Sequence, residues 1–122
     1  MDISGLLCDL ARVDRMLWVI GSGDVVSENT AVRALEPEFT DGYVNIEADQ
    51  WHIHLNVDSV KGVQFVEAED HGIPYLYYVR FSDATEGTIF RVYFPNPYLD
   101  DHDEPASFQP EKLKVFERVR DQ

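Results

Sequence analysis

The chain has only one cysteine among its 122 residues. A single thiol, Cys8, excludes an intrachain disulfide, which is typical of a protein that works in a reducing compartment. The neighbours of Cys8 offer no cation that would activate its thiol. The sequence therefore predicts a thiol packed in a helix rather than a reactive one.

Long apolar runs are also missing. No stretch approaches the roughly 20 apolar residues that a membrane-spanning helix needs. The N-terminus, Met1-Asp-Ile-Ser, lacks the basic and then apolar segments of a secretory signal. We therefore expect a cytoplasmic protein and, at this length, one domain over residues 1–122.

Positive charge is scarce. Ten Lys and Arg stand against 23 Asp and Glu, which gives a formal net charge of −13. Nucleic acids and anionic membranes are bound through basic patches, so the composition predicts neither as a partner. Seven of the ten cations are Arg. In so acidic a chain, we expect an Arg that points into a sheet face to meet an anion.

Alternating apolar residues predict a run of antiparallel strands through the centre of the chain. The expected strands are 15–20, 25–28, 43–47, 51–56, 63–68, 73–82 and 88–94. Residues 31–41 show no period and are expected to form a loop, and 69–72 are expected to form a turn. An apolar stripe predicts a short helix over 3–10, and Pro110 is placed to begin a C-terminal helix that ends near Arg120.

His52 and His54 lie on one face of the strand 51–56, opposite its apolar side chains, because strand side chains alternate. A His-x-His pair on a strand is half of a metal site. His71, in a predicted turn, and His102, in an acidic loop, are not obviously placed to complete it. A protein-only metal site, a single ligand histidine and no role at all remain open at this point.

The strands 73–82 and 88–94 have one plainly apolar face, which we expect in the core. It consists of Tyr75, Tyr77, Val79, Phe81, Phe90, Val92 and Phe94. With a four-residue loop at Asp83–Glu86, the strands are predicted to pair Tyr78 with Arg91 and Arg80 with Ile89. The second face then mixes apolar and aromatic side chains with two guanidiniums. It consists of Leu76, Tyr78, Arg80, Ile89, Arg91 and Tyr93.

Such a mixed face suits haem. Haem is a flat apolar disc whose iron takes an imidazole or a phenolate, and Arg can pair its two carboxylates. These residue types alone do not choose between haem and a protein partner.

A series of short motifs extends from Leu17 to the C-terminal helix. It consists of Leu17-Trp-Val-Ile, Gly23-Asp-Val-Val-Ser-Glu28, Gly42-Tyr-Val-Asn45, Trp51-His-Ile-His-Leu-Asn56, Val63-Gln-Phe-Val-Glu67, Tyr78-Val-Arg-Phe81 and Phe90-Arg-Val-Tyr-Phe94. Their order resembles the cytosolic haem-utilisation proteins of the ChuX/HutX type, which are related to single halves of HemS. The resemblance implies an α+β fold with a large curved antiparallel sheet flanked by N-terminal and C-terminal helices. It also implies homodimers that bind haem or a related tetrapyrrole.

The resemblance also suggests roles for individual residues. His54 matches a position that often carries a histidine, so it is expected to be the axial ligand of the haem iron. Arg91, and less regularly Arg80, match basic positions that would pair the haem propionates. Tyr78 and Tyr93 would pack the ring or supply a phenolate. Some members carry a further histidine after the first strand, where this chain has Gly21.

Three functions follow from this reasoning. The first is a non-enzymatic haem carrier in haem or iron utilisation. The second is a haem-free dimerising module on the same fold, which Gly21 and the net acidity support. The third is a haem-degrading enzyme, for which the sequence shows no dedicated proton relay and no catalytic residue. The sequence does not identify a second axial ligand.

Overall fold

The computed structural model describes residues 2–70 and 73–122. Its elements are α1 (Ile3–Ala11), β1 (Met16–Ser22), β2 (Val25–Ala31), β3 (Glu38–Thr40), β4 (Tyr43–Glu47), β5 (His52–Asn56), the 3₁₀ turn η1 (Val57–Ser59), β6 (Gly62–Asp70), β7 (Ile73–Ser82), β8 (Thr88–Tyr93) and α2 (Pro110–Arg120). The predicted turn at 69–72 includes His71 and Gly72, which lie outside the described residues. No helix in the described ranges is long and apolar enough to cross a membrane.

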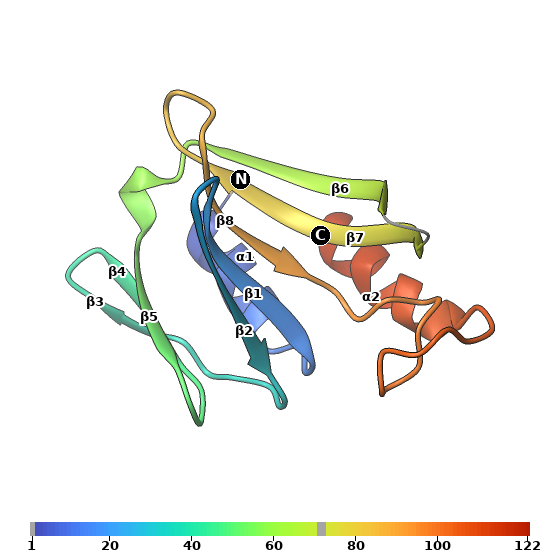
Figure 1. The fold of residues 1–122 in the computed structure, drawn as a ribbon. Helices are drawn as coiled ribbons and strands as arrows, with labels where there is room; N and C mark the ends of the chain where they lie inside the picture. The colour runs from blue at the N-terminus through green and yellow to red at the C-terminus, as the bar shows by residue number, and fades with distance from the viewer. Residues whose placement is uncertain (1, 71–72) are drawn as a thin grey trace.

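The strands form two antiparallel sheets (Figure 1). The large sheet has the order β2-β1-β8-β7-β6, and the small sheet has the order β3-β4-β5. The expected α+β fold, with antiparallel strands between N-terminal and C-terminal helices, is confirmed. The strand β3 was not predicted. It is three residues long and is defined by its pairing with β4, a contact that no local pattern reveals.

The core lies between the inner face of the large sheet, the two helices and the inner face of the small sheet. Leu7 and Leu10 of α1 and Phe116 of α2 belong to one buried cluster with residues of both sheets. Within it, Phe90 stacks on Phe81 at 4.2 Å between ring centroids and on Trp18 at 6.3 Å. Such offset aromatic pairs add to the stability that burial itself gives.

The predicted core face of β7 and β8 is confirmed except at Tyr75. The Tyr75 side chain is 38% exposed, whereas Tyr77 is 4% exposed. Phe116 of α2 packs its ring 5.2 Å from that of Tyr77. Tyr75 instead lies beside the rings of Tyr77 and Tyr98, at 6.3 and 6.4 Å. Alternation identified the correct side of the strand but not where the helix covers it.

The predicted register of β7 and β8 is wrong by two residues. Tyr78 pairs with Tyr93, and Arg80 pairs with Arg91. A bulge between Phe81 and Ser82 and a loop that reaches Gly87 cause the difference. The connection includes Gly87, because Ser82 pairs with Thr88, and it is closed by a hydrogen bond from the amide of Asp83 to the Gly87 carbonyl at 2.9 Å. The two guanidiniums are therefore cross-strand neighbours.

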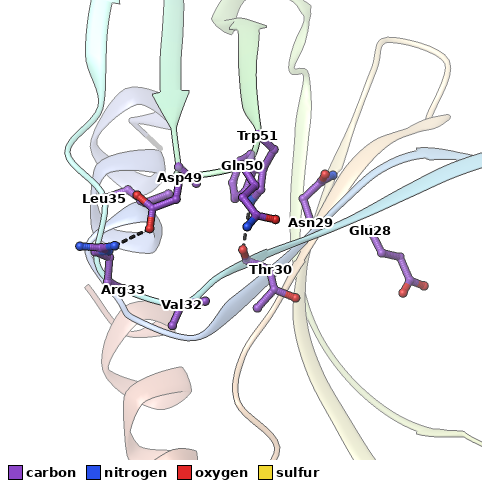
Figure 2. Close-up of a pocket in the computed structure, with 10 residues that line it drawn as sticks. Glu28, Asn29, Thr30, Val32, Arg33, Leu35, Asp49, Gln50 and Trp51 are labelled. Carbon is purple, nitrogen blue, oxygen red and sulfur yellow. Dashed lines mark hydrogen bonds and ion pairs between the residues drawn. The ribbon is translucent and has the colours of Figure 1, made fainter.

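Two polar contacts join the small sheet to the large one (Figure 2). The indole Nε1 of Trp51 donates to the carbonyl of Thr30 at 2.9 Å, and Arg33 forms an ion pair with Asp49. Both contacts link the turn before β5 to the end of β2 and the segment that follows it. They fix the spacing between the two sheets at this point.

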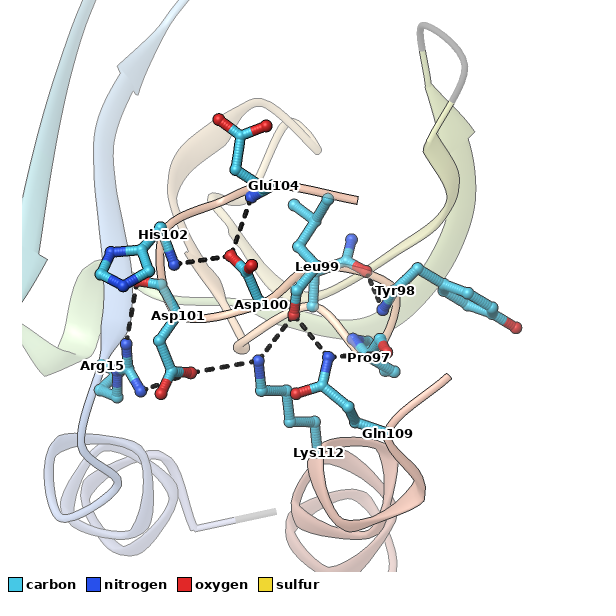
Figure 3. Close-up of polar contacts among 11 residues, drawn as sticks. Arg15, Pro97, Tyr98, Leu99, Asp100, Asp101, His102, Glu104, Gln109 and Lys112 are labelled. Carbon is cyan, nitrogen blue, oxygen red and sulfur yellow. Dashed lines mark hydrogen bonds and ion pairs between the residues drawn. The ribbon is translucent and has the colours of Figure 1, made fainter. Parts of the chain in front are cut away.

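The acidic loop before α2 is held by its own side chains (Figure 3). The carboxylate of Asp100 accepts hydrogen bonds from the amides of His102 and Glu104, at 2.8 and 3.1 Å. Asp101 forms an ion pair with Arg15 at 2.6 Å, and this hydrogen-bonded guanidinium lowers the pKa of the Asp101 carboxyl. The loop is thus tied to the segment between α1 and β1.

Candidate functional site

His54 lies on the outer face of the small sheet, opposite Asn45 of β4. The two side chains are hydrogen-bonded, with 2.6 Å between His54 Nδ1 and Asn45 Oδ1. An amide oxygen only accepts, so Nδ1 carries the proton, and in the neutral ring Nε2 keeps its lone pair. The ring is therefore oriented and exposed, with one nitrogen available to a ligand. Ligand histidines in metal sites are commonly fixed in this way through their other nitrogen.

Asn45 was not singled out from the sequence. A three-residue turn at 48–50 would place Asn45 opposite Ile53. The structure has a four-residue connection, 48–51, which pairs Glu47 with His52 and Asn45 with His54, so the length of the turn decides this contact.

His52 is exposed beside His54, with 5.3 Å between the ring centroids. Both rings line a small pocket of about 110 Å³ together with Glu38, Asn45 and Glu47. Within residues 2–70 and 73–122, no three His, Cys, Asp or Glu side chains are grouped closely enough to hold a metal ion. His71 lies outside these ranges. In the described chain, the histidine pair is an open ligand position rather than a closed protein metal site.

The outer face of the large sheet, which we call the open face, carries the other four candidate residues. Tyr78 packs against its cross-strand partner Tyr93 with 4.6 Å between ring centroids and 31° between the ring planes. Arg80 and Arg91 form the next pair along the two strands. Leu17 and Val19 of β1 continue the same face beside Tyr93 and Arg91. The described helices pack on the opposite, inner face of this sheet.

Arg80 is fully engaged in local contacts. Its Nε donates to Thr88 Oγ1 at 2.6 Å, one terminal nitrogen donates to Gln64 Oε1 at 2.8 Å, and the other donates to the carbonyl of Glu86. These bonds tie the β7–β8 loop to the strands on either side. Three of the five N–H donors of Arg80 are therefore used in local contacts, against one for Arg91.

Arg91 differs from Arg80. One terminal nitrogen donates to the hydroxyl of Tyr93 at 3.2 Å, and the guanidinium carbon lies 5.8 Å from the centroid of the Tyr93 ring. The Nε of Arg91 is buried without a hydrogen-bond partner in the described chain. Arg91 also forms no ion pair there, although carboxylates outnumber cations by more than two to one. It is the arginine on this face that can still bind an anion.

The structure brings Tyr78, Tyr93, Arg80 and Arg91 together and places His54 on the other sheet. Gly21, where some ChuX/HutX-type proteins carry a histidine, has a φ of +90°. A Cβ added there would lie 2.5 Å from the carbonyl oxygen of Val25. The backbone at this turn therefore excludes a histidine without rearrangement.

The chain is similar in fold to several solved structures. The structure of the "Heme Binding Protein ChuX" superposes with a TM-score of 0.74 at 14% identity, over 96% of this chain and 69% of that chain. A protein from Agrobacterium tumefaciens superposes with a TM-score of 0.74 at 25% identity, over 97% of this chain and 65% of that chain. ChuS, an E. coli heme oxygenase, gives a TM-score of 0.68 at 16% identity, over 93% of this chain and 32% of that chain.

The chain thus spans about two thirds of the first two proteins and about one third of ChuS. No curated protein matches it in sequence. A protein-family model matches residues 4–120, which is nearly the entire chain. Together with the shared fold, this match shows that the chain belongs to the ChuX-type haem-utilisation family.

Proposed function

We propose that the protein binds haem, or a closely related tetrapyrrole, as a non-enzymatic carrier in the cytoplasm. The observation that carries the proposal is the hydrogen bond between His54 and Asn45, which leaves His54 Nε2 as an oriented ligand atom. Neutral imidazole is a common axial ligand of haem iron. The family of the chain, and the haem-binding protein among its structural relatives, support the choice of haem over another ligand.

Arg91 and the tyrosine pair are the second support. A propionate is a carboxylate, and the partly buried guanidinium of Arg91 has donors left for one. The neighbouring rings of Tyr78 and Tyr93 offer an aromatic surface beside it. Bound haem would supply an iron centre that takes an axial ligand from the protein. His54 would hold that iron at the outer face of the small sheet. Arg91 faces outward from the other sheet, so it would pair the propionate of a haem on the open face, while Arg80 would serve mainly to fix the loop.

A homodimer is part of the same proposal. The open face presents apolar and aromatic side chains on a sheet whose described helices all lie on the other side. Sedimentation of the protein with and without haemin measures whether two chains pair and whether the ligand changes the pairing. His54 and Arg91 lie on different sheets, so each needs its own readout.

The test is a haemin titration of the purified protein followed by difference absorbance. A saturable shift of the Soret band is expected, and His54→Ala should abolish it or change its position. His52→Ala is the matched control, because His52 is exposed on the same strand face but has no hydrogen bond to a described residue that would fix its ring. Arg91→Met should weaken affinity without moving the Soret band. Equal behaviour of the two histidine variants would reject His54 as the ligand.

A haem-free dimerising module is the second candidate, because the backbone at Gly21 excludes the histidine that some family members carry. A titration that matches a non-binding control protein, together with a stable dimer, would favour it. Loss of the Soret band under a reductant, with catalase present, would instead indicate haem degradation.

A further inference from the structure

One row of side chains crosses the open face from β2 to β8. Glu28 of β2 pairs with Val19 of β1, and Val19 pairs with Arg91 of β8. Neighbouring strand residues point to opposite faces, and Figure 2 shows Glu28 and Asn29 on opposite sides of β2. Glu28 therefore stands on the open face, where it is exposed and forms no ion pair or hydrogen bond with any described residue. It is an acid without a counter-ion at the edge of this face.

Arg91 stands at the other end of this row and has no counter-ion in the described chain. One terminal nitrogen donates to the Tyr93 hydroxyl at 3.2 Å, and neither the other terminal nitrogen nor the buried Nε bonds to a described residue. Val19, which is 3% exposed, lies between Arg91 and Glu28. Two strand spacings, about 10 Å, separate the backbones of the two charged residues. The face thus presents a carboxylate and a guanidinium that can each pair with a second molecule.

The next row of the open face repeats this arrangement. Thr30 of β2 pairs with Leu17 of β1, and Leu17 pairs with Tyr93 of β8. In both rows, an apolar residue of β1 has a polar side chain on either side of it. The hydroxyls of threonine and tyrosine can each donate and accept a hydrogen bond, so they complement one another as a carboxylate and a guanidinium do. This part of the open face is therefore complementary to itself about the line of β1.

The positions of the charges select one way of pairing two such faces. A two-fold axis that lies along β1, between two copies of the face, places β2 of each copy opposite β8 of the other. Glu28 then lies opposite Arg91 of the second copy, twice over, and Val19 and Leu17 meet their own counterparts at the centre. An axis along β8 would instead oppose Arg91 to itself, which is unfavourable for like charges. An axis between β1 and β8 would oppose Glu28 to Arg80, whose three nitrogens are already bonded.

We propose that, in the haem-free protein, two copies pack open face against open face about β1, and that Glu28 of each copy supplies the anion that Arg91 of the other lacks. This inference rests on the homodimer proposed above and not on haem binding. Sheets that pack face to face lie about 10 Å apart, so the two ion pairs are enclosed between them. Opposite charges attract more strongly there than in water. Because the net charge of −13 opposes the association of two copies, these specific pairs set the register of the contact.

Sedimentation equilibrium of the haem-free full chain tests the proposal by measuring the dissociation constant of the dimer. Glu28→Lys opposes two cations at both ends of the contact and should raise this constant at least about thirtyfold. Non-specific repulsion predicts the opposite, because the variant is less acidic than the wild type. Arg91→Glu should also weaken the dimer, and the double variant, in which the charges are exchanged, should restore it to within about threefold. Glu111→Lys, at an exposed position of α2, makes the same charge change away from the open face and should not weaken the dimer.

Glu28→Gln keeps the shape of the side chain and should weaken the dimer about tenfold, less than Glu28→Lys, since it removes the attraction without adding repulsion. Circular dichroism shows which variants are folded, and the comparison of the two Glu28 variants does not depend on Arg91→Glu. A wild-type chain that sediments as a monomer at every concentration, a dimer that Glu28→Lys leaves intact, or a folded double variant no tighter than the single variants would overturn the proposal. The Soret titration measures haem binding separately, so failure of this contact is distinguishable from failure of the haem proposal.

Discussion

Two arginines are paired across β7 and β8, and replacing each by Met should affect stability differently. Arg80→Met is expected to destabilise the protein clearly. Arg91→Met is expected to leave stability nearly unchanged or to raise it slightly. Met keeps most of the length and apolar character of the arginine stem, so the comparison isolates the guanidinium.

The cost at Arg80 follows from its three hydrogen bonds. Its guanidinium donates to Thr88, Gln64 and the carbonyl of Glu86, which hold the β7–β8 loop. A protein hydrogen bond contributes about 1 kcal/mol net, and these bonds are partly exposed. We therefore expect Arg80→Met to lower the free energy of unfolding by about 2 kcal/mol.

The balance at Arg91 is different. Its buried Nε lacks a partner in the described chain, and an unpaired buried donor costs about 1–3 kcal/mol. Its charge also lies opposite that of Arg80, and like charges directly across a strand pair are unfavourable. The substitution gives up the cation–π contact with Tyr93, worth about 0.5–1 kcal/mol, and one long hydrogen bond. These terms nearly cancel, with a small gain expected for Arg91→Met.

Urea unfolding measures the difference. With a slope of about 1.5 kcal/mol per M, which is usual for small proteins, the midpoints of the two variants should differ by more than 1 M. Arg12→Met is the control, because Arg12 pairs with Glu36 at a site where both side chains are more than half exposed, and its midpoint should stay near the wild-type value. If Arg91→Met were as destabilising as Arg80→Met, Arg91 would be a structural residue, and its proposed role in binding an anion would lose its basis.

Three further results are expected. Gly21→Ala should destabilise the protein by about 2 kcal/mol or more, because φ is +90° and the new Cβ meets a backbone oxygen, whereas Gly23→Ala, with φ at +68° and open space, should cost about 1 kcal/mol in thermal or urea unfolding. Asp101→Asn should destabilise the protein at neutral pH, and the difference from the wild type should shrink as the pH falls below the ordinary carboxyl pKa of about 4. Folding lowers the pKa of this carboxyl through Arg15, so its contribution is full above its ordinary value near 4 and disappears as the pH falls through the lowered value. Asn45→Ala should weaken haemin binding roughly 10–100-fold in the Soret titration, because the ligand ring loses its orienting partner.

Local alternation was enough to predict the buried side of β7 and β8 and the exposure of His52 and His54. These features follow from a period of two residues within single strands. The two helices also followed from local signals, an apolar stripe in α1 and Pro110 at the start of α2.

The pairing of Arg80 with Arg91 could not be predicted in the same way. It depends on the bulge beside Ser82 and on the inclusion of Gly87 in the loop, which a hydrogen bond from Asp83 to Gly87 closes. A one-residue bulge and one extra loop residue move every cross-strand neighbour. The difference between the two arginines depends on their hydrogen bonds, which use all three nitrogens of Arg80 but leave the Nε of Arg91 without a partner in the described chain.

The two tryptophans of the chain lie on either side of the junction between the sheets. Trp18 is in β1 of the large sheet, and Trp51 immediately precedes β5, with its indole nitrogen hydrogen-bonded to the carbonyl of Thr30. Intrinsic fluorescence should therefore report the separation of the two sheets rather than unfolding in general. If the small sheet detaches first, the emission of the protein will change before its far-UV circular dichroism does. Tryptophan fluorescence can therefore test whether the large sheet and the small sheet unfold together.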